Sequence, residues 1–97
     1  MEIRGLGVLE AFAQRHPKAR TALQKWLTVV QAAAWKTLED IKKAYNSVDY
    51  IREKGLYCFD IGGNNYRLLA VISLRAGFII IEHIFTHQEY DKWNKIR

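Results

Sequence analysis

Two apolar runs late in the chain constrain its fold more than any other feature. Residues 66–74 and 78–85 are the longest such runs in the sequence, and a third run covers residues 56–61. Short segments rich in glycine and asparagine separate the three runs. Apolar runs of this length, bounded by turn residues, are typical of buried β-strands. The sequence therefore predicts three antiparallel strands joined by two tight turns.

The two turns also predict how the strands pair. If residues 63–64 form a two-residue turn, Asp60 faces Arg67 across the first hairpin. If residues 76–77 form the second turn, Arg67 faces Thr86. On this register Asp60, Arg67 and Thr86 lie side by side across three strands. A longer first loop would shift the pairing, and a slip of one residue would place Arg67 on the other face of the sheet.

Helical periodicity marks the first part of the chain. Residues 6–15 predict one helix. Proline is favourable in the first turn of a helix and harmful inside it, so we expect a break at His16 and a second helix from Pro17 to about Ala34. The residues that share the core-facing spacing are Leu9, Phe12 and Ala13 in the first helix, and Leu23, Trp26, Leu27, Val30 and Ala34 in the second.

A third, shorter helix is expected over residues 38–45. Thr37 with Asp40 three residues later is a capping signal, and Leu38, Ile41 and Tyr45 then share one face. Residues 48–52 can add a short strand before the turn at Lys54-Gly55. The predicted fold class is α+β: N-terminal helices packed on a twisted antiparallel sheet of about four strands, with a short C-terminal helix.

Length and charge narrow the functional classes. A chain of 97 residues is a single domain, residues 1–97, with one modest core. Residues 1–45 hold eight Lys/Arg against four Asp/Glu, and residues 46–97 hold seven against six, so the net charges are +4 and +1. A basic helical half indicates an anionic partner or surface. The exposed face of the second helix is either simply solvated or in contact with RNA; it carries Lys18, Arg20, Lys25 and Gln31.

The lack of a recognisable targeting signal and the single cysteine favour a cytoplasmic protein. The longest apolar runs are far shorter than the roughly 20 residues that cross a membrane, so no membrane association is expected. The first twelve residues lack the pattern of a secretory signal. Cys58 is the single cysteine and fits a reducing compartment. Its position inside an apolar run favours a small buried side chain over a catalytic thiol. No phosphate-binding glycine loop, dinucleotide motif or metal-ligand spacing is present, and no cofactor is expected.

The polar residues of the last segment point to a phosphate-handling site. Thr86 and Glu89 form a capping box that begins a helix at His87. Tyr90 lies three residues after His87 and Asp91 lies four after it, so all three can share one face of the helix. The start of a helix attracts anions, and Arg67 is expected on the neighbouring strand. Lys92 and Lys95 follow on the same helix, and Trp93 is expected to pack the helix onto the sheet.

These residue types suit RNA cleavage without a metal. Histidine can exchange a proton near neutral pH, arginine can bind a phosphate through paired hydrogen bonds, and tyrosine can stack, orient or donate a proton. Simpler interpretations stay open: Arg67 can merely pair with Asp60, Glu89 can be only a cap, and Tyr90 can edge the core. His83 is expected to be structural and His16 to lie at the surface. Lys36 is a candidate phosphate contact.

The runs FDIGGNNYRL and THQEYD resemble the HigB family of bacterial toxins, within the RelE-like superfamily. The resemblance extends over the WK pair at 35–36, the DIKKAY segment and the tyrosine at position 50, and so covers nearly the whole chain. It implies that Arg67, His87 and Tyr90 occupy catalytic positions. It also implies that Lys36 and Asn64 match recurring family residues, and we add Lys92 and Lys95 as candidate RNA contacts.

The resemblance implies an endoribonuclease that cuts mRNA, typically on the ribosome, with no metal. It further implies a HigA-like antitoxin with a helix-turn-helix. Two departures reduce the positive charge of the site: Glu82 stands where relatives often have a basic residue, and Asp60 where they often have asparagine. An alternative is therefore a binding module that holds RNA or an antitoxin without catalysis. A third is a plain structural domain with no salt-dependent affinity for RNA.

Overall fold

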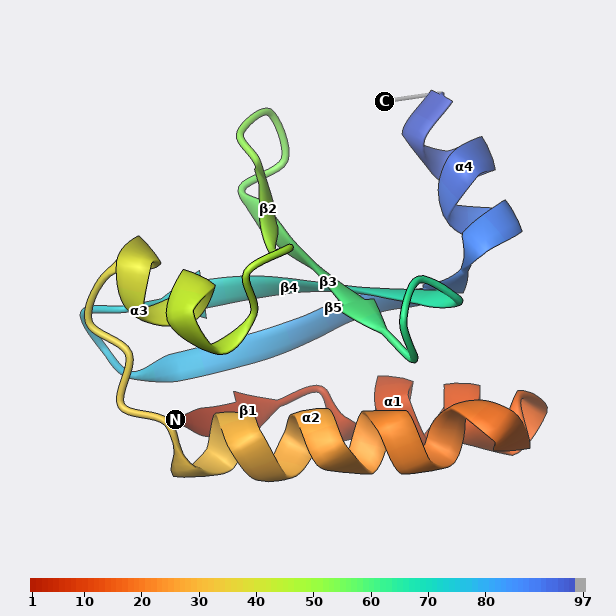
Figure 1. The fold of residues 1–97 in the computed structure, drawn as a ribbon, viewed down its shortest axis with the longest axis horizontal. Coiled ribbons are helices and arrows are strands. Elements are labelled where there is room, and N and C mark those ends of the chain that lie inside the picture. Colours follow the sequence, from red (N-terminus) through yellow and green to blue (C-terminus); the bar gives the residue numbers. More distant parts are fainter. Residues whose placement is uncertain (96–97) are drawn as a thin grey trace.

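The structure is a twisted five-stranded sheet with helices on one face and at one end (Figure 1). It is a computed structural model and describes residues 1–95. Its elements are β1 (Glu2–Arg4), α1 (Leu6–Arg15), a 3-10 turn η1 (Pro17–Ala19), α2 (Arg20–Ala32), α3 (Leu38–Ala44), β2 (Asp49–Ile51), β3 (Leu56–Ile61), β4 (Tyr66–Ser73), β5 (Phe78–Thr86) and α4 (His87–Lys95). The strands lie in the order β1-β5-β4-β3-β2, and the predicted α+β class is confirmed.

The first two helices follow the predicted pattern with one correction. Helix α1 covers the predicted residues, His16 ends it, and Pro17 opens the short turn η1 before α2. Helix α2 ends at Ala32 rather than Ala34, because Ala33 is extended, with ψ of 152°. Ala34 is consequently exposed, and its place in the apolar stripe was wrongly predicted. Leu27 is partly buried, and the other stripe residues of both helices are buried: Leu9, Phe12, Ala13, Leu23, Trp26 and Val30.

Helix α3 has the predicted cap, but fewer of its predicted core-facing residues are buried. The Thr37 hydroxyl accepts the Asp40 N–H at 3.2 Å, and the Asp40 carboxylate accepts the Thr37 N–H at 3.2 Å. These two bonds lower the pKa of Asp40, after the larger effect of the Lys36 N–H. Ile41 is fully buried, but Leu38, the first residue of the helix, is 39% exposed and does not share the buried face as predicted.

Strand β1 has no counterpart in the sequence prediction. It runs parallel to β5, with Ile3 opposite Ile79. A three-residue strand with one central apolar side chain gives too little periodicity to be recognised. Gly5 then reverses the chain into α1 with φ of 84°, a conformation that favours glycine. The sheet is therefore mixed, with four antiparallel strands and one parallel edge strand.

The register of the first hairpin is as predicted, and that of the second is not. Asp60 pairs with Arg67 across β3 and β4. Arg67, however, pairs with Phe85, and Thr86 lies opposite Tyr66. Two features cause the difference. The second turn spans residues 74–77, closed by the Gly77 N–H to the Ser73 carbonyl at 2.8 Å, and the ladder shifts between Leu69 and Ala70.

The sheet has an apolar cluster on each face. The larger cluster lies between the sheet and helices α1 and α2, which share one side of it in Figure 1. Phe59 is at its centre and contacts the rings of Trp26, Trp35 and Tyr45. The smaller cluster joins four buried residues to partly buried side chains of β4, β5 and α4: Ile51, Leu56, Cys58 and Leu69, with Val71, Phe85, Tyr90 and Trp93. Within residues 1–95 no helix is long and apolar enough to cross a membrane.

Gly5 gives a direct test of the packing between β5 and the start of α1. A Cβ at this position would lie 2.6 Å from the carbonyl oxygen of Ile81, and the positive φ adds strain. We expect Gly5→Ala to lower the free energy of unfolding by about 2 kcal/mol or more. Gly7→Ala is the matched control, because its Cβ meets open space on α1. Its stability should stay level or rise by up to about 1 kcal/mol. Urea unfolding measures both, and equal midpoints for the two variants would contradict this account.

Candidate active site

Three elements meet where β4 begins and β5 ends. The turn between β3 and β4 covers residues 62–65, and the carbonyl of Asn65 accepts the His87 N–H at 2.9 Å. This bond ties the turn to the first residue of α4, which projects from the sheet at this end (Figure 1). The predicted capping box is also present. The Glu89 N–H donates to the Thr86 hydroxyl at 3.2 Å, and the Thr86 N–H donates to the Glu89 carboxylate at 2.8 Å.

Arg67 is the centre of this arrangement. Its Nε lies 3.1 Å from Asp60 Oδ1, and its Nη1 donates to the carbonyls of Asn64 at 2.7 Å and Tyr66 at 3.2 Å. Its Nη2 lies 3.3 Å from His87 Nδ1. The side chain is only 13% exposed. Since a guanidinium has five N–H donors, these contacts with described residues leave one Nη2 N–H for a further acceptor.

His87 has a different set of partners for each of its protonation states. Arg67 can only donate, so its contact with Nδ1 requires the neutral ring with the proton on Nε2. Nε2 lies 3.3 Å from Asp91 Oδ2 and can donate to it. When Nδ1 is also protonated, it can donate instead to the Asn64 carbonyl, 3.2 Å away. An imidazole with a ready partner in either state is suited to exchanging a proton.

Tyr90 lies on the same side of the sheet as Arg67 and His87. The guanidinium carbon of Arg67 is 5.7 Å from the centre of the Tyr90 ring, within the range of a cation–π contact. The ring centre of Trp93 is 5.9 Å from that of Tyr90 and 5.7 Å from that of Phe85. Trp93 thus packs α4 against β5, as predicted from its spacing.

The remaining candidate residues divide between this site and distant surfaces. Asn64 belongs to the site and contributes its backbone carbonyl. Lys92 and Lys95 are exposed on α4. Lys36 is exposed just before α3, and Figure 1 shows α3 and α4 at opposite ends of the sheet. Lys36 is therefore not brought together with Arg67 and His87.

The two other histidines lie outside the group around Arg67. His83 is exposed, and its ring stacks on that of Phe85 with centroids 5.2 Å apart. His16 is half-buried against the ring of Phe12, so the expectation of a plain surface position is only partly met.

Sequence reasoning missed two contributions to the site. Asp91 was placed on the same face as His87, but its contact with Nε2 was not recognised, although the i, i+4 spacing is the usual signal for such a pair. The helix start was expected to offer free N–H groups to an anion. The N–H groups of His87 and Glu89 already have acceptors, Asn65 and Thr86. The helix start therefore has fewer free N–H groups than expected, and Arg67 supplies the cation of the candidate site.

Cys58 behaves as a buried side chain. It is 5% exposed, and burial raises the pKa of its thiol to about 11, although a hydrogen bond with Tyr90 and the charge of Arg67 act in the opposite direction. A thiol with so high a pKa is almost fully protonated at neutral pH and is a poor nucleophile. Among residues 1–95, no group of three or more His, Cys, Asp or Glu side chains is arranged to hold a metal ion.

Comparisons with known proteins agree on one family. A family model described as "HigB_toxin, RelE-like toxic component of a toxin-antitoxin system" matches residues 19–93. The chain is 30% identical over 93 residues to "mRNA interferase HigB" of Escherichia coli O6:H1. The matched residues are 95% of this chain and 90% of the relative. It is 27% identical over 84 residues to "mRNA interferase toxin HigB" of Escherichia coli K12 and to "mRNA interferase HigB" of Shigella flexneri, covering 86% of this chain and 81% of each relative.

The raised pKa of Cys58 predicts that its thiol reacts slowly and that the free energy of unfolding falls at high pH. At pH 8 iodoacetamide should modify the folded protein at least about 100-fold more slowly than the urea-unfolded chain, because the pKa rises from 9.0 to about 11. The protonated thiol is favoured by folding, so its contribution is complete below pH 9 and is lost as the pH rises through about 11.

The control is Cys58→Ala. Burial also raises the pKa values of Tyr45 and Tyr57, so both proteins should lose stability in alkali, but the variant should lose less. Fast modification of the native wild type, or identical alkaline stability curves, would contradict this assignment.

Proposed function

The chain belongs to the HigB family of RelE-like toxins, and we propose that it is a ribosome-associated mRNA endoribonuclease that works without a metal ion. The family consists of toxic components of toxin–antitoxin systems. The observation that carries the proposal is the contact between Arg67 and His87, 3.3 Å, in a site that also includes Tyr90. Such an arrangement places a cation and a proton-exchanging group where one phosphate can reach both.

The chemistry requires two proton transfers and one site of negative charge. A base removes the proton of the 2′-hydroxyl, which attacks the adjacent phosphorus. An acid then gives a proton to the departing 5′-oxygen, leaving a 2′,3′-cyclic phosphate on the upstream RNA. Each proton-transfer group typically contributes a rate factor of roughly 10²–10⁴. A cation that lies beside the phosphorane stabilises the charge that develops there.

We assign these roles to the residues in contact. His87 exchanges the proton and changes partner as it does so, from Arg67 when neutral to the Asn64 carbonyl when charged. Arg67 stabilises the phosphate through its Nη2 N–H. Tyr90, whose ring lies against Arg67, orients the substrate or stacks on a base.

Further contacts with RNA are proposed on the surfaces around the site. Lys92 and Lys95 lie on α4 and can meet the phosphates next to the cleaved one. Lys36, at the other end of the sheet, would contact a different part of the mRNA or of ribosomal RNA. We propose that the protein acts in the cytoplasm and that its partner is a HigA-like antitoxin with a helix-turn-helix.

A second candidate is a binding module without strong catalysis. The ion pair between Arg67 and Asp60 favours it, because the carboxylate compensates the charge that should stabilise the phosphorane. The low exposure of Arg67 acts in the same direction, since it limits access of a phosphate to the guanidinium. The two candidates differ in whether the purified protein cleaves RNA at all.

The main test removes the catalytic pair. We expect Arg67→Ala with His87→Ala to abolish growth inhibition on induction and to lower cleavage of ribosome-bound mRNA by more than about 100-fold. The control pair, Arg75→Ala with His16→Ala, removes the same residue types outside the site and should remain toxic. Circular dichroism establishes that both variants fold. Full toxicity in a folded Arg67/His87 double variant would end the proposal.

Asp60→Asn separates the two candidates. The amide keeps an oxygen that can accept from Arg67 Nε, but it removes the compensating charge. For a nuclease we expect cleavage of mRNA to rise about two- to five-fold, because removing the carboxylate of this partly buried ion pair leaves more of the Arg67 charge for the phosphate. If neither the wild type nor this variant cleaves RNA while both still bind it, the binding module is the correct description.

A further inference from the structure

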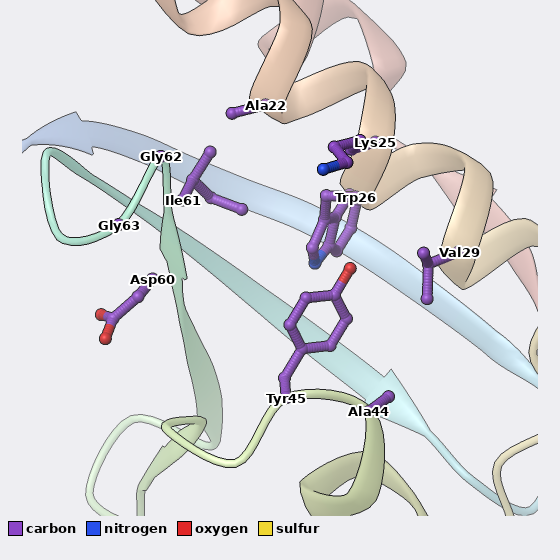
Figure 2. Close-up of a pocket in the computed structure, with 10 residues that line it drawn as sticks. All are labelled: Ala22, Lys25, Trp26, Val29, Ala44, Tyr45, Asp60, Ile61, Gly62 and Gly63. Atoms are coloured by element: carbon purple, nitrogen blue, oxygen red, sulfur yellow. The ribbon is translucent and has the colours of Figure 1, made fainter.

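A cavity lies on the helix-covered side of the turn between β3 and β4. Its volume is about 410 Å³, which is within the range of ligand-binding pockets. Helix α2 forms one wall, the end of α3 a second, and the end of β3 with its turn a third (Figure 2). The apolar part of the lining comes from Ala22, Trp26, Val29, Ala44 and Ile61. Arg67 and His87 do not line it, but Asp60, the ion-pair partner of Arg67, does.

The wall of this cavity contains a polar group that lacks a partner. Trp26 is completely buried, and among the described residues none accepts a hydrogen bond from its indole Nε1. Figure 2 shows this nitrogen directed toward the hydroxyl end of Tyr45, a half-buried side chain that also lines the cavity. Burial raises the pKa of Tyr45, so its hydroxyl keeps its proton and can donate. The Trp26 N–H lacks an acceptor among the described residues, and the Tyr45 hydroxyl, which lines the cavity, can donate to a group placed there.

The helix beside the cavity carries positive charge. Residues 17–38 contain Lys18, Arg20, Lys25 and Lys36 and no acidic residue, and Glu10 of α1 pairs with Arg20. Lys25 lines the cavity, and Val29, one turn later on α2, is 44% exposed. A second hollow of about 530 Å³ shares these two residues and extends along α2 to Arg20. The two hollows meet at Lys25 and Val29, and we refer to them together as the groove. From residue 20 to residue 29 the helix rises about 13 Å.

We propose that this groove, which the two hollows form along α2, binds an acidic amphipathic segment of the antitoxin. An apolar side chain of that segment would lie over Val29 and in the cavity, and an acidic side chain would pair with Lys25. Its carboxylate or carbonyl oxygens can accept a hydrogen bond from the Tyr45 hydroxyl, which lines the cavity. The proposal rests on the toxin function proposed above, because that function supplies the antitoxin as the partner.

The lining favours a peptide over RNA. Of the cationic residues of α2 and η1, only Lys25 lines the cavity, and Arg20, which lines the second hollow, is paired with Glu10 at 3.3 Å. A phosphate chain would therefore find few uncompensated charges along the groove. The buried position of the indole leaves no open aromatic face for a base to stack on. The exposed Val29 instead needs an apolar cover, which a peptide side chain provides.

The test reverses the charge beside the cavity. The full chain carries His87→Ala, so that it can be produced, and calorimetry measures its affinity for the antitoxin purified from its own operon. Lys25→Glu and Val29→Asp should each weaken binding by 10-fold or more. Lys42→Glu is the matched control: it makes the same charge change at an exposed position of α3 outside both hollows, and it should alter the affinity less than two-fold.

A charge swap and an RNA probe complete the experiment. An antitoxin in which one acidic residue is changed to lysine should regain binding to the Lys25→Glu variant. The affinity of both groove variants for a 12-nucleotide single-stranded RNA should equal that of the parent protein. The proposal is overturned if neither groove variant affects the antitoxin, or if both weaken RNA and leave the antitoxin unaffected. Because the readout is binding, it is independent of cleavage. If the wild type cuts mRNA and Lys25→Glu binds the antitoxin normally, only the groove proposal is refuted. If Lys25→Glu binds the antitoxin weakly and the wild type does not cut mRNA, only the nuclease proposal is refuted.

Discussion

The guanidinium of Arg67 is the interaction on which the candidate site depends. It binds Asp60 on β3, the Asn64 carbonyl in the turn and the ring of His87 at the start of α4. A side chain that is only 13% exposed and makes this many bonds has little freedom to move. Together with the bond from the His87 N–H to the Asn65 carbonyl, it holds the turn against the start of α4. The carboxylate of Asp60 also compensates part of the positive charge of Arg67, so the contacts that hold the side chain weaken its attraction for an anion.

The part of the site that depends on local sequence could be predicted. The capping box of Thr86 and Glu89 needs only residues three apart, and the pairing of Asp60 with Arg67 needs only the length of one turn. The neighbour on the other side of Arg67 could not be predicted in this way. It depends on a four-residue second turn and on the register shift beside Leu69, and the sequence carries no clear signal for either. Phe85 therefore stands where Thr86 was expected.

The fold shows the same division between local and distant causes. The amphipathic stripes of α1 and α2 predicted which residues are buried, because their spacing alone sets the inner face. Strand β1 was missed because its pairing with β5 is a contact between residues about 76 positions apart, as in Ile3 with Ile79. The exposure of Leu38 likewise depends on how α3 approaches the sheet rather than on its own sequence.

One turn links the two binding surfaces. Gly62 and Gly63 form part of the cavity wall beside α2, and the next two residues present the carbonyls that hold Arg67 and His87. Both glycines have positive φ, 62° and 73°, which a side chain would strain. A partner bound in the cavity would therefore contact the same turn whose backbone holds Arg67 and His87. If the proposed roles of these two residues are correct, such a partner could act on the site from the opposite face of the sheet, because four consecutive residues serve both faces.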